Sequence, residues 1–408
     1  MRPLTPSLAL VVLMAAAPAL AQSGRAPAVS GPPNAPDQQP AFEAQTRAPQ
    51  PPRDAAVSVE TVAQRLPQVW AMELLPDGRM LVTAKSGAMH IVGQNGRAGP
   101  PIRGVPQVDS RGQGGLLDVA LAPDFDTSNT IFFSFSEPRG NRTNATSVAR
   151  AQLSTNDQGG GQLSDVEVIF QQTPAYAGTK HFGSRLAFAP DGTLFVTVGE
   201  RSDTPIRDQA QDLDSGLGKV FRINPDGSIP SDNPFVGNDA AQPAIWSYGH
   251  RNLQSATMDD EGRLWTVEHG PRGGDELNQP QPGLNYGWPV ITYGINYGGS
   301  PVGQGITAQE GMEQPVYYWD PVIAPSGMDY YADGPIEAWR GAFLVGGLQS
   351  RGIVILHMED GQVAYEERLP LQARTRDVKV GPDGAVYAVT EGGGGSSIVR
   401  ITSSAQAD

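Results

Sequence analysis

The sequence predicts an all-β fold, a six-bladed β-propeller with four-stranded antiparallel blades, on three observations. The composition includes 49 Gly and 36 Pro among 408 residues, which is typical of many tight turns between short strands. An apolar run, an acidic turn and a second β-rich run recur along the chain. The roughly eight amphipathic helices that a (β/α)₈ barrel requires cannot be found.

Six acidic turns mark the repeat. Most pair Asp with Gly or Pro, and Asp-Gly supplies the positive φ of a two-residue hairpin. Successive markers are 47, 67, 69, 73 and 50 positions apart, which fits blades of four short strands with loops of variable length. A pair of β-sandwiches with ordinary hairpins is the alternative. The markers are Asp77, Asp124, Asp191, Asp260, Asp333 and Asp383.

A β-rich run follows each marker and is expected to form a strand. These runs fill the chain from residue 57 to residue 403, which we assign to a single propeller domain with a short tail at 404–408. Loops from several blades meet at the central channel of a propeller, so we expect the functional site there. The runs are 80–82, 131–133, 194–196, 264–267, 342–345 and 386–389.

The first 56 residues differ in character from the rest. Residues 1–21 contain Arg2, an apolar run over 8–17 and an Ala-Leu-Ala sequence at 19–21, the pattern of a cleaved signal peptide. A retained membrane anchor is the alternative, although the apolar run is short for a bilayer. Residues 22–56 are rich in Pro, Ala, Gln and Ser and are expected to be a disordered linker. The protein is therefore predicted to be periplasmic or secreted.

Charge and cysteine content exclude several classes of protein. The chain has no Cys, so it has neither disulfides nor thiolate metal sites. A net charge of −14 argues against a nucleic-acid partner, which needs clustered Lys and Arg. No segment after the leader reaches about 18 apolar residues, so stable membrane insertion is not expected. An acidic chain also suits binding of Ca²⁺.

Four segments carry groups suited to chemistry. His181 precedes a predicted strand and has the ordinary pKa of a general base near neutrality, with Glu200 or Asp203 as the group that would orient its ring. The segment 247–252 combines aromatic, cationic and amide groups, and 268–278 combines Gly and Pro carbonyls with an Asp-Glu pair that suits calcium. Arg374 and Arg376 alternate on one face of an extended segment. Each segment taken alone also fits a structural role.

Together these segments resemble the soluble aldose sugar dehydrogenases that depend on pyrroloquinoline quinone (PQQ), members of the glucose/sorbosone dehydrogenase family. The resemblance covers residues 58–402 and rests on motifs that occur in family order. These motifs are 112–117, 181–183, 210–213, 249–252, 268–278, 285–289 and 294–297.

The resemblance implies a reaction and a set of contacts to PQQ. His181 would remove the proton from the anomeric hydroxyl of a cyclic aldose, and hydride from the same carbon would pass to the quinone, giving a lactone. Gln349 stands where the family usually has a Lys, with Arg351 two residues on as the cation that could compensate. The remaining implied contacts are Gln113, Arg251, Asn252, Tyr297, Arg374 and Arg376.

The resemblance also implies two calcium ions. One would bind the backbone carbonyls of Gly270 and Pro271 next to the quinone, and the other Glu276 and the carbonyl of Tyr286. A sugar substrate and an external electron acceptor are the expected partners, in a monomer or homodimer. The alternatives are a PQQ-dependent dehydrogenase of a sorbosone-type sugar aldehyde, a calcium-dependent propeller lactonase, and a carbohydrate-binding propeller without catalysis.

Overall fold

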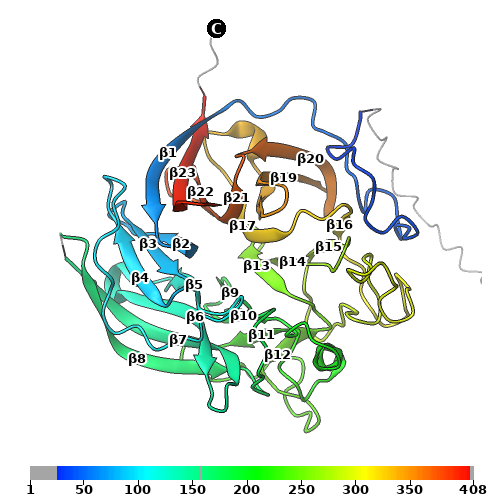
Figure 1. Cartoon of the computed structure of the whole chain (residues 1–408), viewed down its shortest axis with the longest axis horizontal. Coiled ribbons are helices and arrows are strands. Elements are labelled where there is room, and N and C mark those ends of the chain that lie inside the picture. The colour runs from blue at the N-terminus through cyan, green and yellow to red at the C-terminus, as the bar shows by residue number, and fades with distance from the viewer. Residues whose placement is uncertain (1–24, 157, 405–408) are drawn as a thin grey trace, which may run out of the picture.

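The computed structural model describes residues 25–156 and 158–404, and they form six antiparallel sheets arranged as blades around one axis (Figure 1). The predicted six-bladed propeller is confirmed. The predicted signal peptide lies outside the described residues. Within them, no helix is long and apolar enough to cross a membrane.

The blades follow one another along the chain. The first contains β2 (Val69–Leu74), β3 (Met80–Ala84) and β4 (Ala88–Val92). The second contains β5 (Leu116–Leu121), β6 (Thr130–Pro138), β7 (Asn144–Thr155) and β8 (Gly161–Gln171). The third contains β9 (Gly183–Phe188), β10 (Leu194–Val198), β11 (Lys219–Ile223) and β12 (Ile245–Tyr248).

The last three blades have the same plan. The fourth contains β13 (Leu253–Met258), β14 (Leu264–Glu268), β15 (Asp275–Asn278) and β16 (Tyr317–Trp319). The fifth contains β17 (Pro325–Tyr331), β18 (Ala342–Gly347), β19 (Gly352–Glu359) and β20 (Gln362–Pro370). The sixth contains β21 (Arg374–Val380), β22 (Val386–Gly392), β23 (Gly395–Ser403) and β1 (Val57–Leu66). Three short helical turns complete the structure, α1 (Phe125–Ser128), η1 (Ile206–Gln211) and η2 (Glu337–Trp339).

The first blade departs from the four-stranded prediction. Its sheet has three strands in the described part of the chain, and a single bridge between Val92 and Ala98 takes the place of the fourth. The sixth blade is closed by both ends of the chain, because β1 pairs with β23 from Val57 opposite Ser403 onward. The N-terminal strand therefore completes the ring.

All six acidic turn markers occupy the same place in their blades. Each lies between the first strand of a blade and the second, for example Asp77 between β2 and β3 and Asp191 between β9 and β10. The first strands, β2, β5, β9, β13, β17 and β21, contact one another around the axis. The markers therefore all lie at the end of the ring where the first strands finish, and the opposite end is free for a site.

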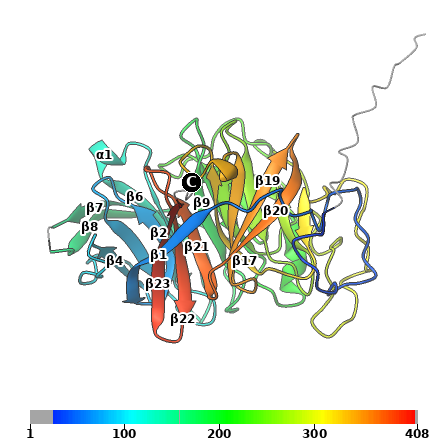
Figure 2. The ribbon, with the colours of Figure 1, turned by 90° about the horizontal axis from the view of Figure 1, so that it is seen from above.

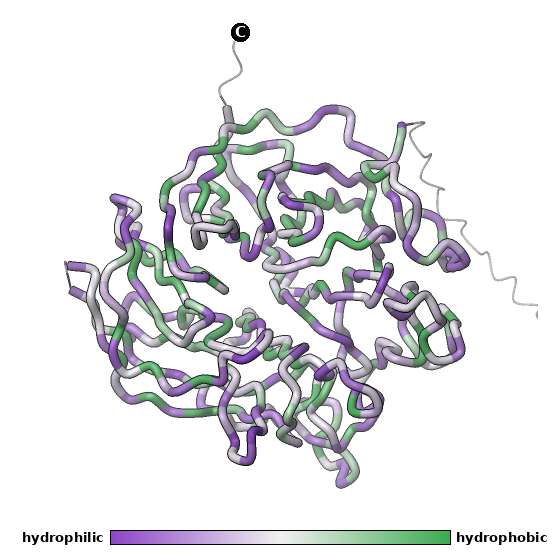
Figure 3. Tube along the Cα trace, viewed as in Figure 1, coloured by the Kyte–Doolittle hydropathy of each residue, from purple (hydrophilic) through white to green (hydrophobic). Residues whose placement is uncertain are grey.

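The hydrophobic core lies between neighbouring blades rather than at one centre. Most central strands are buried on both faces, as in β3 and β10, and hydrophobic segments follow the strands in Figure 3. One cluster joins Leu81 and Met89 of the first blade to Phe133 and Ala149 of the second. Each blade is thus held by apolar burial against its neighbours.

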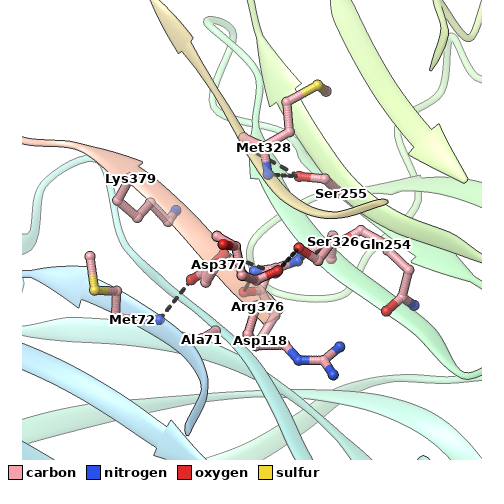
Figure 4. Close-up of polar contacts among 12 residues, drawn as sticks. Ala71, Met72, Asp118, Gln254, Ser255, Ser326, Met328, Arg376, Asp377 and Lys379 are labelled. Atoms are coloured by element: carbon pink, nitrogen blue, oxygen red, sulfur yellow. Dashed lines mark hydrogen bonds and ion pairs between the residues drawn. The ribbon is translucent and has the colours of Figure 1, made fainter. Parts of the chain in front are cut away.

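The axis itself holds buried charges. Arg185 on β9 forms ion pairs with Asp118 on β5 and with Asp377 on β21, each at 2.9 Å. The other Asp377 oxygen accepts from the backbone N of Met72 on β2 at 2.9 Å, a contact drawn in Figure 4. Because a buried charge is costly without partners, this network fixes the relative positions of the strands it joins.

Residues 25–56 correct the prediction of a disordered linker. They pack along the fourth and fifth blades (Figures 1 and 2), and Gln45 and Ala48 are fully buried. Gln45 O accepts from the backbone N of Tyr318 at 2.8 Å, and Arg47 donates to the carbonyl of Asp320 at 2.7 Å. The composition predicted disorder because large apolar residues are few; hydrogen bonds to the edges of the two blades order the segment instead. We refer to residues 25–56 as the N-terminal strap.

Candidate active site

A cavity of about 430 Å³ opens at the end of the ring where the first strands begin. Residues that enter or begin the first strand of each of the six blades line it, so residues far apart in sequence meet. Seven of the predicted site residues are among them. They are Gln113, His181, Arg251, Asn252, Tyr297, Arg374 and Arg376.

His181 is buried in the wall of the cavity and held at both its backbone and its ring. Its backbone N donates to Gln113 Oε1 at 2.7 Å, and its Nδ1 lies 2.9 Å from Glu200 Oε2. Since Nδ1 is engaged, Nε2 is the ring nitrogen left for a substrate. Asp203, the other candidate for orienting the ring, instead bonds Tyr176 and pairs with Lys180.

Close backbone contacts around His181 explain why residues 183 and 199 are glycines. His181 itself has a φ of 50°, in the left-handed region. A Cβ added to Gly199 would lie 2.3 Å from the His181 carbonyl oxygen, and one on Gly183 would lie 2.6 Å from the Gly199 nitrogen. These close approaches bring the start of β9 against the end of β10, and so place Glu200 beside the imidazole.

The pKa of His181 is below the ordinary histidine value. Burial disfavours the charged ring and is the largest cause; Glu200 opposes it, while Arg251 lowers the pKa further. His181 is therefore neutral at pH 7 and able to accept a proton. Glu200 is fully buried and would stabilise the imidazolium that forms.

Arg251 and Asn252 form the wall next to His181. The Arg251 guanidinium donates through Nη1 to the carbonyls of His269 and Gly270 at 2.9 and 2.7 Å, and its buried Nε has no hydrogen-bond partner among the described residues. No carboxylate in that part of the chain forms an ion pair with it. Asn252 Oδ1 accepts from the backbone N of Gly183 at 3.2 Å.

The opposite wall carries a cluster of charges. Glu391 accepts from Arg374 Nε at 3.1 Å and from Arg376 Nε at 2.8 Å. Burial opposes ionisation of Glu391, but the two arginines outweigh it and hold the pKa of that carboxyl below its usual value. Lys85 also lines the cavity. The lining thus contains four cations, Lys85, Arg251, Arg374 and Arg376, and one carboxylate, a net of three positive charges.

Sequence reasoning missed Lys85 and Glu391. Glu391 reaches Arg374 only through the pairing of β21 with β22, where the two residues are direct partners. Lys85 comes from a turn of the first blade that carries no motif. The only signal in the sequence is that Lys is rare, with four in the chain.

Two predicted contacts lie apart from the cavity lining. Gln349 is exposed, and its neighbour Leu348 lines the cavity instead. Arg351 is also exposed and donates to the Gln372 carbonyl, so it does not replace a cation in the cavity. Tyr297 lines the cavity and is 74% exposed, which places it at the rim.

The residues predicted to bind calcium lie behind Arg251. Gly270 O accepts from that guanidinium, and Gly270 N donates to Asp275 at 2.8 Å. Glu276 shares the Asn278 side-chain amide with Glu268, each at 3.1 Å, and burial and the Glu268 charge raise the pKa of Glu276.

Tyr286 belongs to the same group. Its ring stacks on His250 at 4.7 Å, and His250 bonds Glu268 at 3.0 Å. Glu276 has no basic ion-pair partner among the described residues, and the buried Asn278 Oδ1 has no donor there; both are groups that a cation satisfies. Among those residues no cluster of three or more acidic, His or Cys side chains has metal-binding geometry, so a calcium site here has to include other oxygen ligands, such as backbone carbonyls or Asn278 Oδ1.

Comparison with known proteins identifies the class to which this fold and cavity belong. The model of the family described as Glucose / Sorbosone dehydrogenase matches residues 66–400. The chain therefore belongs to this family of oxidoreductases.

Individual relatives agree with this assignment. The chain is similar to the aldose sugar dehydrogenase YliI of Escherichia coli strain K12, with 40% identity over 344 residues that cover 83% of this chain and 91% of the relative. The crystal structure of the soluble aldose sugar dehydrogenase of Escherichia coli in its apo form matches with a TM-score of 0.80 and 38% identity, over 85% of this chain and 100% of that chain. The PQQ-bound aldose sugar dehydrogenase of Streptomyces coelicolor matches with a TM-score of 0.69 and 30% identity, over 86% and 99% of the two chains.

Proposed function

We propose that this protein oxidises cyclic aldoses at C1 to lactones, with PQQ and calcium bound in the cavity described above. The observation that carries the proposal is the charge of the cavity. Four cations face one carboxylate there, and the net of three positive charges equals the number of carboxylates on PQQ. Arg251 is buried and has no carboxylate partner among the described residues; because a buried cation without a counter-ion is costly, this cationic cavity favours a polyanionic ligand.

His181 is the proposed general base. Its neutral ring accepts the proton of the anomeric hydroxyl at Nε2 while Nδ1 stays bonded to Glu200, 2.9 Å away. The proton on Nε2 gives an imidazolium that the Glu200 carboxylate stabilises. Loss of that proton together with hydride from C1 converts the ring C–OH to the lactone carbonyl.

When bound, PQQ would supply a two-electron acceptor for the hydride, and calcium would supply a Lewis acid next to the quinone. Arg251, Arg374 and Arg376 would hold its carboxylates, while Gln113 and Asn252 offer amide groups. Tyr297 at the rim offers an aromatic face. These residues line one cavity, which is the arrangement that such a ligand requires.

Calcium fits the residues present, with one adjustment. The Gly270 carbonyl accepts a hydrogen bond from the Arg251 guanidinium at 2.7 Å, so this oxygen already contacts a cation. A calcium ion bound to the carbonyls of Gly270 and Pro271 would replace that contact. Glu276 and the carbonyl of Tyr286 would hold the second ion. The adjacent Glu268 supports this assignment, since two nearby carboxylates bind a divalent ion better than one.

The mature protein is proposed to act in the periplasm or outside the cell, where an external acceptor reoxidises it, as a monomer or homodimer. The test of the activity is reconstitution of the purified protein with PQQ and Ca²⁺, followed by reduction of an artificial electron acceptor with a panel of aldoses. Sugar-dependent reduction is expected. Turnover of sorbosone-type aldehydes alone would assign the alternative substrate class, and no reduction with any substrate would overturn the proposal.

A further inference from the structure

We propose that Lys85 binds a carboxylate of the PQQ placed in this cavity and supplies the cation that is lacking at Gln349. This inference rests on the proposed function. It adds a residue from the first blade to the site, outside all the motifs that predicted it.

The backbone of Lys85 is fixed between two segments that also line the cavity. Its N donates to the Gln68 carbonyl at 2.9 Å. On the other side, a Cβ added to Gly115 would lie 2.1 Å from the Lys85 carbonyl oxygen. Gly115 has a φ of 145° and closes the loop that carries Gln113. The turn that bears Lys85 is therefore packed against the loop of Gln113. These contacts fix the position of the Lys85 backbone at the cavity wall.

The Lys85 ammonium group has no counter-ion in the part of the chain that the structure describes. Its Nζ donates to the Ser110 carbonyl at 2.8 Å, and no carboxylate among the described residues pairs with it. The nearby Asp109 is already engaged by Arg111 at 2.5 Å. Burial and the neighbouring Arg376 charge lower the pKa of Lys85, and the Asp109 charge opposes them without offsetting them. An anion between Lys85 and Arg376 would relieve this repulsion.

Neither position 349 nor position 351 supplies a cation to the cavity. Gln349 is exposed and outside the lining, and Arg351 is exposed and bonded to Gln372. Without Lys85 the side chains that line the cavity would carry a net of two positive charges instead of three. Lys85 therefore adds a cation to the site from a position that is distant in sequence from the Gln349 segment.

The experiment measures the Kd of PQQ for the Ca²⁺-loaded protein by the absorbance of the bound quinone. Lys85→Met should raise the Kd at least about tenfold, because a charge-assisted hydrogen bond is lost. Lys85→Arg should stay within about threefold of the parent. Lys180→Met is the matched control: Lys180 is the neighbour of His181, but it lies outside the lining and its ammonium faces Asp203 at 3.7 Å. It should leave the Kd unchanged.

A second measurement is independent of the Kd. PQQ should protect Lys85 from an amine-reactive label, read by mass spectrometry, and should leave Lys180 labelled as before. An unchanged Kd in Lys85→Met, or labelling of Lys85 that PQQ does not alter, overturns the inference. Failure of the parent protein to bind PQQ overturns both the inference and the proposed function. Binding that depends on Lys85 without sugar oxidation leaves this inference standing and removes only the proposed function.

Discussion

The two ring nitrogens of His181 have separate tasks in the proposed reaction. Nδ1 faces Glu200 at 2.9 Å, inside the protein, and Nε2 remains for the sugar hydroxyl. Glu200 Oε1 has no hydrogen-bond partner among the described residues although it is buried. This carboxylate is therefore poised to stabilise the positive ring that exists only after proton transfer.

Replacing His181 should separate catalysis from binding. His181→Ala is expected to lower kcat by about 10²–10⁴-fold, the usual contribution of a general base. The Kd of PQQ should change little, because arginines and amides carry the binding. Steady-state kinetics and a PQQ titration on the same preparation check this. A variant that keeps the parent rate would exclude His181 as the base.

The pH dependence of kcat/KM should report the His181–Glu200 pair. The base must be neutral, so the rate rises with pH through the pKa of His181 and is constant above it, with the rise below the ordinary histidine value. Glu200 raises that pKa by stabilising the charged ring. Glu200→Gln should therefore move the rise to lower pH and lower the plateau, since the base becomes weaker. Asp203→Asn, which removes the other candidate, should leave the profile in place.

The cavity shows what can be predicted residue by residue and what cannot. Local composition singled out the segments of His181, Arg251, Arg374 and Arg376, and the family resemblance implied the role of each residue. Glu391 and Lys85 were missed because neither has such a context. They become site residues through the pairing of β21 with β22 and through the approach of the first blade to the Gln113 loop. Both contacts depend on the tertiary structure and leave no local signal in the sequence.

At the scale of elements, the segments at the two ends of each first strand are not equally predictable from the sequence. The turns at one end, with Asp77 and its equivalents, are short and regular, so they identified all six blades. The segments at the other end carry the site and vary in length. The N-terminal strap was mispredicted because its order depends on partners elsewhere, such as Tyr317, whose hydroxyl accepts from the backbone N of Ala48 at 2.9 Å.

A single charge buried under the N-terminal strap should detach the strap from the blades. Ala48 is 1% exposed and packs in the cluster with Trp319 and Ile323. Ala48→Asp would bury a carboxylate there, so we expect a loss of about 1–3 kcal/mol of stability and faster proteolysis within 25–52. Thermal unfolding and limited proteolysis measure the two effects. Ala41→Asp is the matched control on the exposed face of the strap, and an equal response in both variants would contradict the packing described.

At the scale of the whole molecule, the axial charges connect every blade. Arg185 joins β9 to Asp118 on β5 and Asp377 on β21, and its Nε donates to the Gln254 carbonyl on β13. On the next level, Lys379 of β21 bonds Glu73 of β2 at 2.6 Å, while Asp329 of β17 accepts from the backbone N of Val380. All six first strands therefore contribute to one network below the cavity.

Removing the central cation should weaken the whole ring rather than one blade. Arg185→Met leaves Asp118 and Asp377 buried without their counter-ion, and breaking such a pair costs about 3–5 kcal/mol. For a domain of this length that corresponds to a fall in Tm of about 4–6 °C, because the entropy of unfolding grows with chain length. Arg150→Met removes a cation paired with the exposed Glu167 and should cost less than about 1 kcal/mol. Because Arg185 also lies 4.4 Å from the ring of Trp70, which lines the cavity, the same variant should weaken PQQ binding. A Tm equal to that of Arg150→Met would show that blade packing alone holds the ring together.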